Sequence, residues 1–223
     1  AEIEWLSPQS EYRPTEYVQN WLSFWFDPEQ RLKAAKTLQA DRLENLQKIW
    51  QKEELYHQYG LFLDDPAIDK SLSGLEKNLK EAQSAQDLLE MEARTTKALY
   101  AHVAGTLEYE NFTRDHAGGD KANIFLNHGN YLAYGLAATA LWVLGIPHGF
   151  AVMHGKTRRG ALVFDTADLV KDALVLPTAF ICAIRGDREQ TFRDTVLDLF
   201  VRHEALDRMI ESIKKLCSQY GRE

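Results

Sequence analysis

The sequence has few cysteines, glycines and prolines. Only two of its 223 residues are cysteines, Cys182 and Cys217, so we expect no disulfide framework and a reducing compartment. The counts of 13 glycines and 6 prolines are low for an all-β protein. Residues that favour helices, namely Ala, Leu, Glu, Lys and Gln, dominate instead. The composition therefore predicts a mostly helical protein.

No segment has the length and polarity of a membrane span. The longest apolar run, residues 131–146, is shorter than the roughly 20 residues that a spanning helix needs. Its small residues, among them Gly135 and Ala138, favour close helix packing inside a protein. The chain begins at Ala1 without a methionine and without the pattern of a signal peptide. We therefore expect a fragment or processed product, soluble and cytoplasmic, with residues 1–223 forming one helical domain.

Basic residues are in the minority, which at first argues against a nucleic-acid partner. The net charge is −7, but it is unevenly distributed. Residues 1–92 carry 10 Lys and Arg against 18 Asp and Glu, whereas residues 93–223 carry 16 against 15. A DNA-binding surface would therefore have to be a local patch. The candidates for it are Lys156, Arg158 and Arg159, with Arg185, Arg188 and Arg193 further on.

Apolar residues at helical spacing predict a series of helices. The expected segments are a short aromatic helix from Thr15, then Pro28 to about Glu54, Ser73 to about Tyr109, Ala122 to Leu144, Thr166 to Leu176 and Glu189 to about Cys217. Residues 150–153 and 161–164 are short apolar runs on either side of a basic loop. They suggest either a small hairpin or two extended connectors. The expected fold class is all-α, a multi-helix domain with at most a small hairpin.

Two nearby glutamates differ in their helical neighbours. Glu90 has Arg94 four residues later, which is a common ion pair on a solvated face. Glu92 is surrounded at helical spacing by leucines and threonines, such as Leu88 and Leu99. A carboxylate on an apolar stripe is costly to bury without a cation, a metal ion or a full set of hydrogen bonds. Glu92 is therefore a candidate metal ligand, with pairing to an arginine or a tyrosine hydroxyl as the alternative.

Asp165 and Asp168 lie three residues apart at an expected helix start. We interpret Asp165 as the N-cap of that helix, because a carboxylate accepts hydrogen bonds from the free N–H groups of the first turn. Asp168 could complete this cap or bind a metal ion, and spacing alone leaves both possible. Asp172, one turn on, could be a further acid at the site or a partner for Lys171.

The histidines differ in their surroundings. His154 ends an apolar run and precedes a glycine and the basic loop, where a ligand would face an incoming phosphate. His128, between Asn127 and Gly129, is a second candidate. The loop residues Lys156, Arg158 and Arg159 could bind backbone phosphate or form a plain solvated turn.

Glu92, His154 and Asp168 together form a mixed oxygen and nitrogen ligand set. Such a set suits Mg²⁺ or Mn²⁺ better than a closed zinc site. The sequence has no phosphate-binding P-loop, serine-hydrolase elbow, zinc-protease helix or dinucleotide fingerprint. These absences argue against the corresponding reaction classes.

Four segments carry a resemblance to a known family. They are Glu92-Ala93-Arg94 with Lys97 and Tyr100, then residues 127–135, residues 149–156 and residues 164–169. In order and interval they resemble the CRISPR-associated integrase that captures new spacers, the first Cas protein. The segment at residues 7–14 and the aromatic helix after it are similar to the subtype I-F branch. Many relatives have glycine in place of Ala93, a change that should leave the ligand in place.

The resemblance implies a function for the three ligand candidates. Glu92, His154 and Asp168 match the family's catalytic, metal-binding positions, where Mg²⁺ or Mn²⁺ would assist transesterification during insertion of a spacer at the CRISPR repeat. The implied partners are double-stranded and branched DNA, a second copy of the chain, and a second Cas protein fused to a helicase-nuclease. The family also carries an N-terminal β domain, which we expect to be absent from this chain.

Two alternatives from other classes remain open. The chain could be a non-catalytic helical scaffold that binds DNA or a partner protein. It could also be a general metal-dependent phosphohydrolase acting on small phosphoesters.

Overall fold

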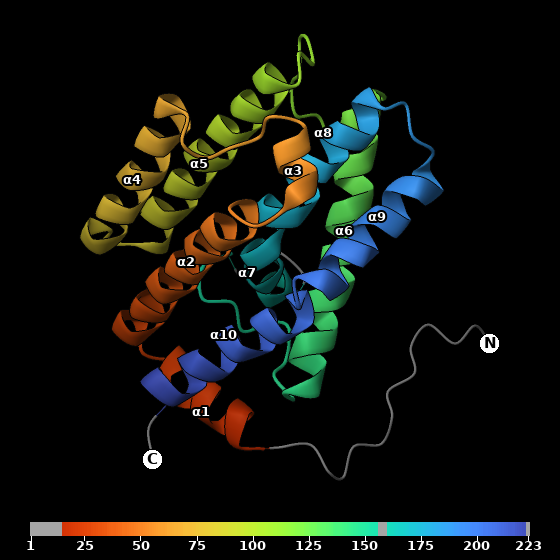
Figure 1. Cartoon of the computed structure of the whole chain (residues 1–223). Coiled ribbons are helices and arrows are strands. Elements are labelled where there is room, and N and C mark those ends of the chain that lie inside the picture. Colours follow the sequence, from red (N-terminus) through yellow and green to blue (C-terminus); the bar gives the residue numbers. More distant parts are fainter. Residues whose placement is uncertain (1–14, 156–159, 222–223) are drawn as a thin grey trace, which may run out of the picture.

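The computed structural model describes residues 15–155 and 160–221, and the regular structure within these ranges is entirely helical (Figure 1). The elements are α1 (Glu16–Trp25), α2 (Pro28–Trp50), α3 (Glu54–Gln58), α4 (Pro66–Glu81), α5 (Ala85–Thr106), α6 (Lys121–Val143), α7 (Ala161–Val170), the π-helical turn η1 (Lys171–Val175), α8 (Leu176–Ile184), α9 (Glu189–Arg202) and α10 (Ala205–Tyr220). The all-α expectation is therefore confirmed. None of the described helices is long and apolar enough to cross a membrane.

The continuous segment α7–η1–α8 forms the centre of the molecule. Helices α2, α6 and α10 pack against α7, and α5, α6 and α9 pack against α8 (Figure 1). Almost every side chain from Ala161 to Ala183 is buried, including the polar residues Asp165, Asp168 and Asp172 among the apolar ones. A helix that is apolar on all sides is stable only when other helices surround it. Any polar side chain on α7 is thereby placed in a largely dry interior.

Gly129 lets α6 approach this centre closely. A Cβ atom at this position would lie 2.4 Å from Cγ1 of Val175 and 3.0 Å from Cζ of Phe192. Side-chain atoms do not approach one another at 2.4 Å, so the close packing of α6 on η1 and α9 requires a residue without a side chain.

Several helix boundaries agree with the sequence prediction. Asp27 caps α2, because its side chain accepts hydrogen bonds from the backbone N–H groups of Glu29 and Gln30, and Pro28 begins the helix. The predicted helix over residues 122–144 corresponds to α6 within one residue at each end. Helix α2 ends at Trp50 rather than near Glu54.

Two predicted helices are interrupted in the structure. The segment 73–109 is divided between α4 and α5, because Ser84 and Asp87 form a capping box that starts a new helix. The segment 189–217 is divided between α9 and α10 at Glu204, whose φ of 51° is incompatible with a continuous right-handed helix.

The prediction for the centre was wrong in two respects. Residues 161–164 are the first turn of α7 and not a strand or connector, while residues 150–153 are irregular. The helix that begins at Ala161 does not end at Pro177, because the chain passes through η1 into α8, with this proline in the first turn of α8. A proline is tolerated there because the first N–H groups of a helix have no intrahelical partner.

Candidate metal centre

Glu92, His154 and Asp168 come together at one side of α7. Glu92 lies on α5, His154 lies in the segment that precedes α7, and Asp168 lies on α7 itself. One ligand atom from each of the three lies within 4.8 Å of the others. Glu90, two residues from Glu92, is exposed and pairs with Arg94 at 3.5 Å. The distinction drawn from helical spacing between the two glutamates therefore agrees with their positions.

The segment that carries His154 is anchored by helix α1. The indole nitrogen of Trp21 donates to the carbonyl oxygen of Phe150 at 3.0 Å, and that of Trp25 donates to the carbonyl oxygen of Ala151 at 2.7 Å. The aromatic residues of the first helix thus hold an irregular segment in place, which explains how a loop residue can be part of a well-defined site.

Asp165 fixes the orientation of His154. Its Oδ2 accepts hydrogen bonds from the backbone N–H groups of Val152 and Met153 at 2.8 and 3.1 Å. Its Oδ1 accepts from the backbone N–H of His154 at 3.1 Å and lies 2.5 Å from Nδ1 of the same residue. With Nδ1 donating to Asp165, Nε2 is the ring nitrogen left to bind an ion, an arrangement common around metal-binding histidines.

The interpretation of Asp165 as a helix cap is therefore wrong. It lies within α7, whose N-cap residue is Gly160 in the left-handed conformation with φ of 64°. Its carboxylate is directed at the preceding segment and not at the first turn of its own helix.

Asp168 is a buried carboxylate whose Oδ2 accepts no hydrogen bond from the described residues. Lys171, one turn later on the same helical segment, forms an ion pair with it. Burial opposes its ionisation, but Lys171, Arg42 and His154 outweigh this effect and hold the pKa of Asp168 below its ordinary value. An ionised carboxylate with unused lone pairs in a dry site is suited to bind a cation.

Glu92 lies in a less favourable environment for its charge. Burial and the nearby charge of Asp168 raise the pKa of Glu92 to about 7, although Arg42 acts in the opposite direction. Arg42, on α2, lies 3.6 Å from Oε1 of Glu92 and also pairs with Asp172. Without an ion, the site therefore holds more negative charge than its surroundings compensate, and a divalent cation would relieve this imbalance.

The remaining predicted residues have different outcomes. Asp172 pairs with Arg42 and not with Lys171. His128 is half-buried beside Phe192 and is not part of the ligand group formed by the described residues. The proposed phosphate-binding residues Lys156, Arg158 and Arg159 lie outside the described residues.

A groove of about 1100 Å³ opens from the candidate metal centre. One wall is the face of α5 that carries Glu92, Lys97 and Tyr100. The groove is also lined by the segment around Arg114 and by side chains from α6, and His154 and Lys171 are exposed to it. Two of the three candidate ligands, Glu92 and His154, therefore line the groove, whereas Asp168 lies buried behind them.

Sequence reasoning did not identify Arg42, Lys171 or Arg114 as parts of this site. Arg42 comes from α2, far from the other residues in the sequence, and no local pattern marks its approach to Glu92. Lys171 follows Asp168 at a spacing of three, which is a detectable signal for an ion pair on a helix.

Comparison with known proteins shows the family of the chain. Residues 5–215 match the family described as CRISPR associated protein Cas1. A CRISPR-associated endonuclease Cas1 from Pseudomonas aeruginosa is 51% identical over 221 residues, which cover 98% of this chain and 68% of the relative. One from Pectobacterium atrosepticum is 52% identical over 219 residues, covering 97% and 67%. The chain thus spans about two thirds of the length of these relatives.

Solved structures show the same fold at lower sequence identity. A Cas1 protein from Thermotoga maritima superposes with a TM-score of 0.72 at 17% identity, over 96% of this chain and 73% of that one. A casposase bound to an integration product superposes with a TM-score of 0.69 at 14% identity, over 96% and 68%. From the family match and the two relatives of about 50% identity, the chain belongs to the Cas1 family of CRISPR-associated proteins.

Proposed function

We propose that this chain is the helical catalytic domain of a metal-dependent DNA endonuclease and integrase that inserts new spacers into a CRISPR array. The relatives named as endonucleases support a nuclease role. The structural neighbour bound to an integration product supports chemistry on DNA strands. The observation that carries the proposal is the buried Asp168, whose Oδ2 accepts no hydrogen bond from the described residues, next to a histidine whose Nδ1 is already engaged.

The residues fit Mg²⁺ or Mn²⁺, because they offer two carboxylates and one imidazole and no thiolate. A divalent ion bound there supplies Lewis-acid activation of an attacking hydroxyl and compensation of charge on the phosphate. Asp165 holds the imidazole of His154 in one orientation. Arg42 and Lys171 compensate part of the negative charge of the site's carboxylates. Lys171 also lines the groove, but its ammonium group is paired with Asp168.

The proposed substrates are double-stranded and branched DNA, comprising the incoming spacer and the CRISPR repeat. A Cas1 protein has been solved as a complex with DNA, and it superposes on this chain with a TM-score of 0.61 at 20% identity. We infer from the family that the chain acts as a homodimer together with a second Cas protein fused to a helicase-nuclease. Lys156, Arg158 and Arg159 remain the proposed contacts to backbone phosphate next to His154.

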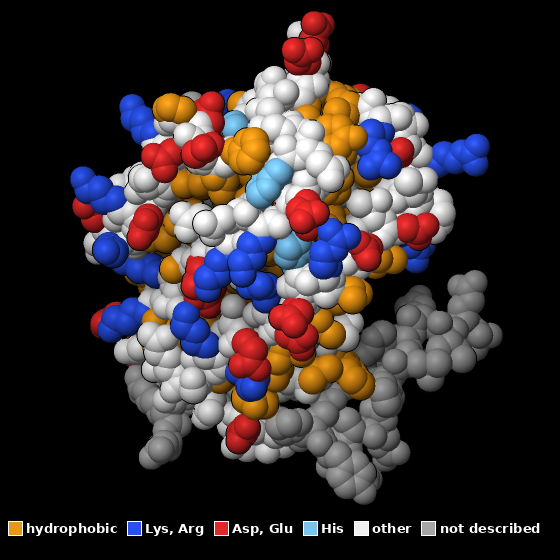
Figure 2. Space-filling model, in the orientation of Figure 1, with side chains coloured by type: hydrophobic (Ala, Val, Ile, Leu, Met, Phe, Trp, Pro, Cys, Tyr) orange, Lys and Arg blue, Asp and Glu red, His pale blue; other side chains and the backbone are white. Residues whose placement is uncertain are grey.

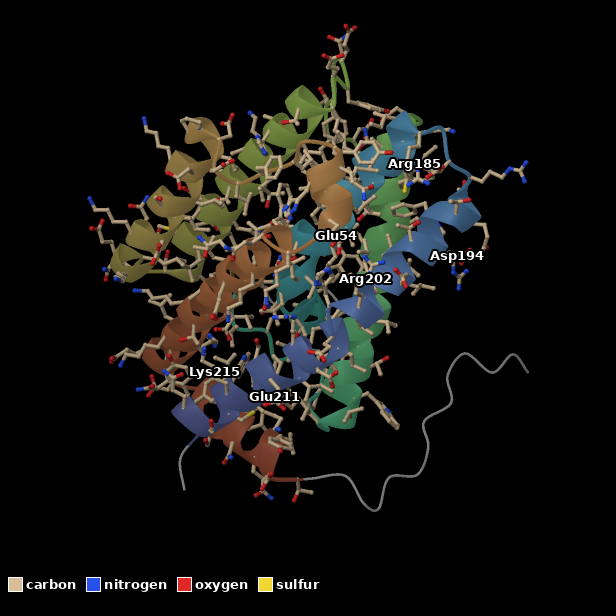
Figure 3. The ribbon with its side chains drawn as sticks, viewed as in Figure 1. Glu54, Arg185, Asp194, Arg202, Glu211 and Lys215 are labelled. Carbon is tan, nitrogen blue, oxygen red and sulfur yellow. The ribbon has the colours of Figure 1, made fainter. Side chains whose placement is uncertain are left out.

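The face formed by α9 and α10 does not offer an alternative basic patch. Figure 2 shows acidic and basic side chains interspersed over it, and Figure 3 shows Arg202 and Lys215 on this face close to acidic residues. Arg202 pairs with Glu53 at 3.1 Å, and Lys215 pairs with Asp41 at 2.6 Å. Each of these two cations is therefore paired with a carboxylate.

Incubation with branched DNA tests the proposal. In the presence of Mn²⁺ the protein should nick or join strands, and a chelator should stop the reaction. Alanine at Glu92, His154 or Asp168 should abolish the activity while DNA binding persists, and Glu90→Ala should remain active because that side chain is exposed on another face.

The outcomes separate the candidate functions. Binding without any metal-dependent reaction would instead support a helical scaffold. Turnover of a small phosphoester without action on DNA would support a general phosphohydrolase. An alanine variant that keeps near-normal activity would show that the substituted residue is not a ligand.

A further inference from the structure

Arg114 is held in an unusual way for an arginine at a protein surface. Its Nη1 donates to Oδ1 of Asn123 and to the carbonyl oxygen of Asp115, both at 2.9 Å. Its Nη2 donates to Oδ1 of Asn127 at 2.6 Å and contacts Nδ1 of His116 at 3.1 Å. These four acceptors are neutral groups. They fix the position of the guanidinium group without compensating its charge.

The anchoring asparagines are themselves held in place. Asn123 lies on α6, and its Nδ2 donates to the carbonyl oxygen of Thr113 at 2.9 Å and to Oδ2 of Asp120 at 2.6 Å. Asn127, one turn later on the same helix, donates from its Nδ2 to the carbonyl oxygen of His116 at 3.0 Å. A rigid helix face therefore sets the orientation of the arginine, so little conformational entropy remains to be lost when it binds a ligand.

Arg114 lines the same groove as Glu92 and His154. Tyr100 connects the two regions, because it lines the groove and also a small cavity of about 50 Å³ with Glu92, Lys171 and Asp172. Burial raises the pKa of the Tyr100 hydroxyl, and the positive charge of Arg114 acts against this rise. The charge of Arg114 thus acts on Tyr100, which lines the same groove as Glu92.

The charge of Arg114 is not compensated within the part of the chain that the structure describes. The exposed residues Glu108 and Glu110 also line the groove, but neither forms an ion pair with it. The other cations near the site differ, since Arg42 pairs with Asp172 and Lys171 pairs with Asp168. A fixed, uncompensated guanidinium group in a groove is suited to bind an anion, and arginine matches the geometry of phosphate.

We propose that Arg114 binds a backbone phosphate of the DNA strand that enters the metal centre along this groove. The inference rests on the proposed function for the chemical class of the ligand. The exposed His116 can yield its contact at Nη2 of Arg114 to a phosphate oxygen, which leaves the anchoring asparagines in place. The contact is to the sugar-phosphate backbone, so Arg114 contributes affinity and position but no preference for base sequence.

Binding measurements in the presence of a chelator test Arg114 separately from catalysis. A labelled single-stranded oligonucleotide would be titrated against wild type, Arg114→Gln and Arg114→Lys over a range of salt concentrations. Loss of one phosphate contact should weaken binding by about tenfold and reduce the slope of log K against log salt by about 0.7. Arg114→Lys should recover part of the affinity, because lysine keeps the charge without the planar donors. Arg94→Gln is the matched control, since Arg94 is an exposed residue of α5 that pairs with Glu90.

A scan with neutral phosphates sharpens the assignment. One methylphosphonate would be moved along the strand, so that each oligonucleotide of the series lacks a single backbone charge. Wild type should lose affinity at one position near the end of the strand, and Arg114→Gln should be insensitive at that same position. If thermal melts show that Arg114→Gln unfolds, Arg114→Lys takes its place in the scan, and an affinity profile like that of wild type at that position would count against the role of Arg114.

The two proposals can fail independently. An unchanged salt slope in a folded Arg114→Gln variant, with a methylphosphonate profile like that of wild type, would refute the role of Arg114 even if cleavage with Mn²⁺ is normal. A loss of affinity at one methylphosphonate position that is seen in wild type but not in Arg114→Gln would support the phosphate contact of Arg114. This holds even if the wild type proved to have no metal-dependent activity.

Discussion

Replacing Glu92 with glutamine should stabilise the protein in the absence of metal. The carboxylate of Glu92 is half-buried close to Asp168, and its pKa is raised from the ordinary value of 4.5 to about 7. A carboxyl group with a raised pKa in the folded state stabilises the fold below the pKa of the unfolded chain, and this contribution is lost as pH rises through the folded value. At pH 8 the folded protein therefore carries an unfavourable charge that Glu92→Gln removes.

The magnitude follows from the difference between the two pKa values. A difference of about 2.5 pH units, at 1.36 kcal/mol each, corresponds to roughly 3 kcal/mol at pH 8 as an upper limit. The attraction of Arg42 at 3.6 Å is already contained in this value, because Arg42 lowers the pKa. For a chain of this size each kcal/mol shifts the melting temperature by about 2 to 4 °C. The effect should be small at pH 5, where Glu92 is protonated in the folded protein.

Thermal unfolding in chelator at pH 5, 6, 7 and 8 measures this difference. The melting temperature of Glu92→Gln should rise above that of wild type as the pH increases, and added Mn²⁺ should stabilise wild type but not the variant. Glu90→Gln is the control on the same helix, with an exposed side chain whose ion pair contributes little. A Glu92→Gln variant that is less stable than wild type at pH 8 would refute the reasoning, because it would show that Arg42 more than compensates the buried charge.

Two further substitutions test the surroundings of the site. Asp165→Asn should reduce Mn²⁺ affinity by about 10- to 100-fold, because the amide cannot hold Nδ1 of His154 as the carboxylate does. Isothermal titration would measure the affinity, and a value like that of wild type would contradict the role of Asp165. Gly129→Ala should lower the free energy of unfolding by about 1 to 3 kcal/mol, since the added methyl group would lie 2.4 Å from Val175. Chemical denaturation would measure this, and an unchanged denaturation midpoint would show that α6 can shift without cost.

The sequence predicted most of the helical segments, but it did not predict α3 or α8 and it joined α4 to α5 and α9 to α10. Most of the protein follows the apolar periodicity of its helices, and the start of α2 is marked by Asp27 and Pro28. The errors fall where a local signal competes with tertiary packing. Pro177 resembles a stop signal, yet the helical segment continues because η1 and the surrounding core place it in the first turn of α8. The break at Glu204 has no glycine to mark it.

The chemistry of the candidate ligands could be inferred from residue type, whereas their partners could not. Glu92 stands out because a carboxylate on an apolar stripe requires compensation, and the structure brings Arg42 within 3.6 Å of it. Nothing in the sequence near Glu92 predicts that α2 would supply this arginine. The same holds for Arg114, whose position depends on two asparagines of α6.

The roles of Asp165 and Asp168 show why helix boundaries matter for chemistry. A helix starting at Thr166 would make Asp165 a cap and would use its oxygens on N–H groups of the first turn. Because α7 begins at Ala161 after Gly160, Asp165 lies beyond that turn and its oxygens are free for Val152, Met153 and His154. The predicted start of this helix was about one turn too late. The prediction therefore gave Asp165 the role of a cap, whereas in the structure it orients His154. Asp168 was less sensitive to this error, because its free Oδ2 depends on burial within the centre of the molecule and not on where α7 begins.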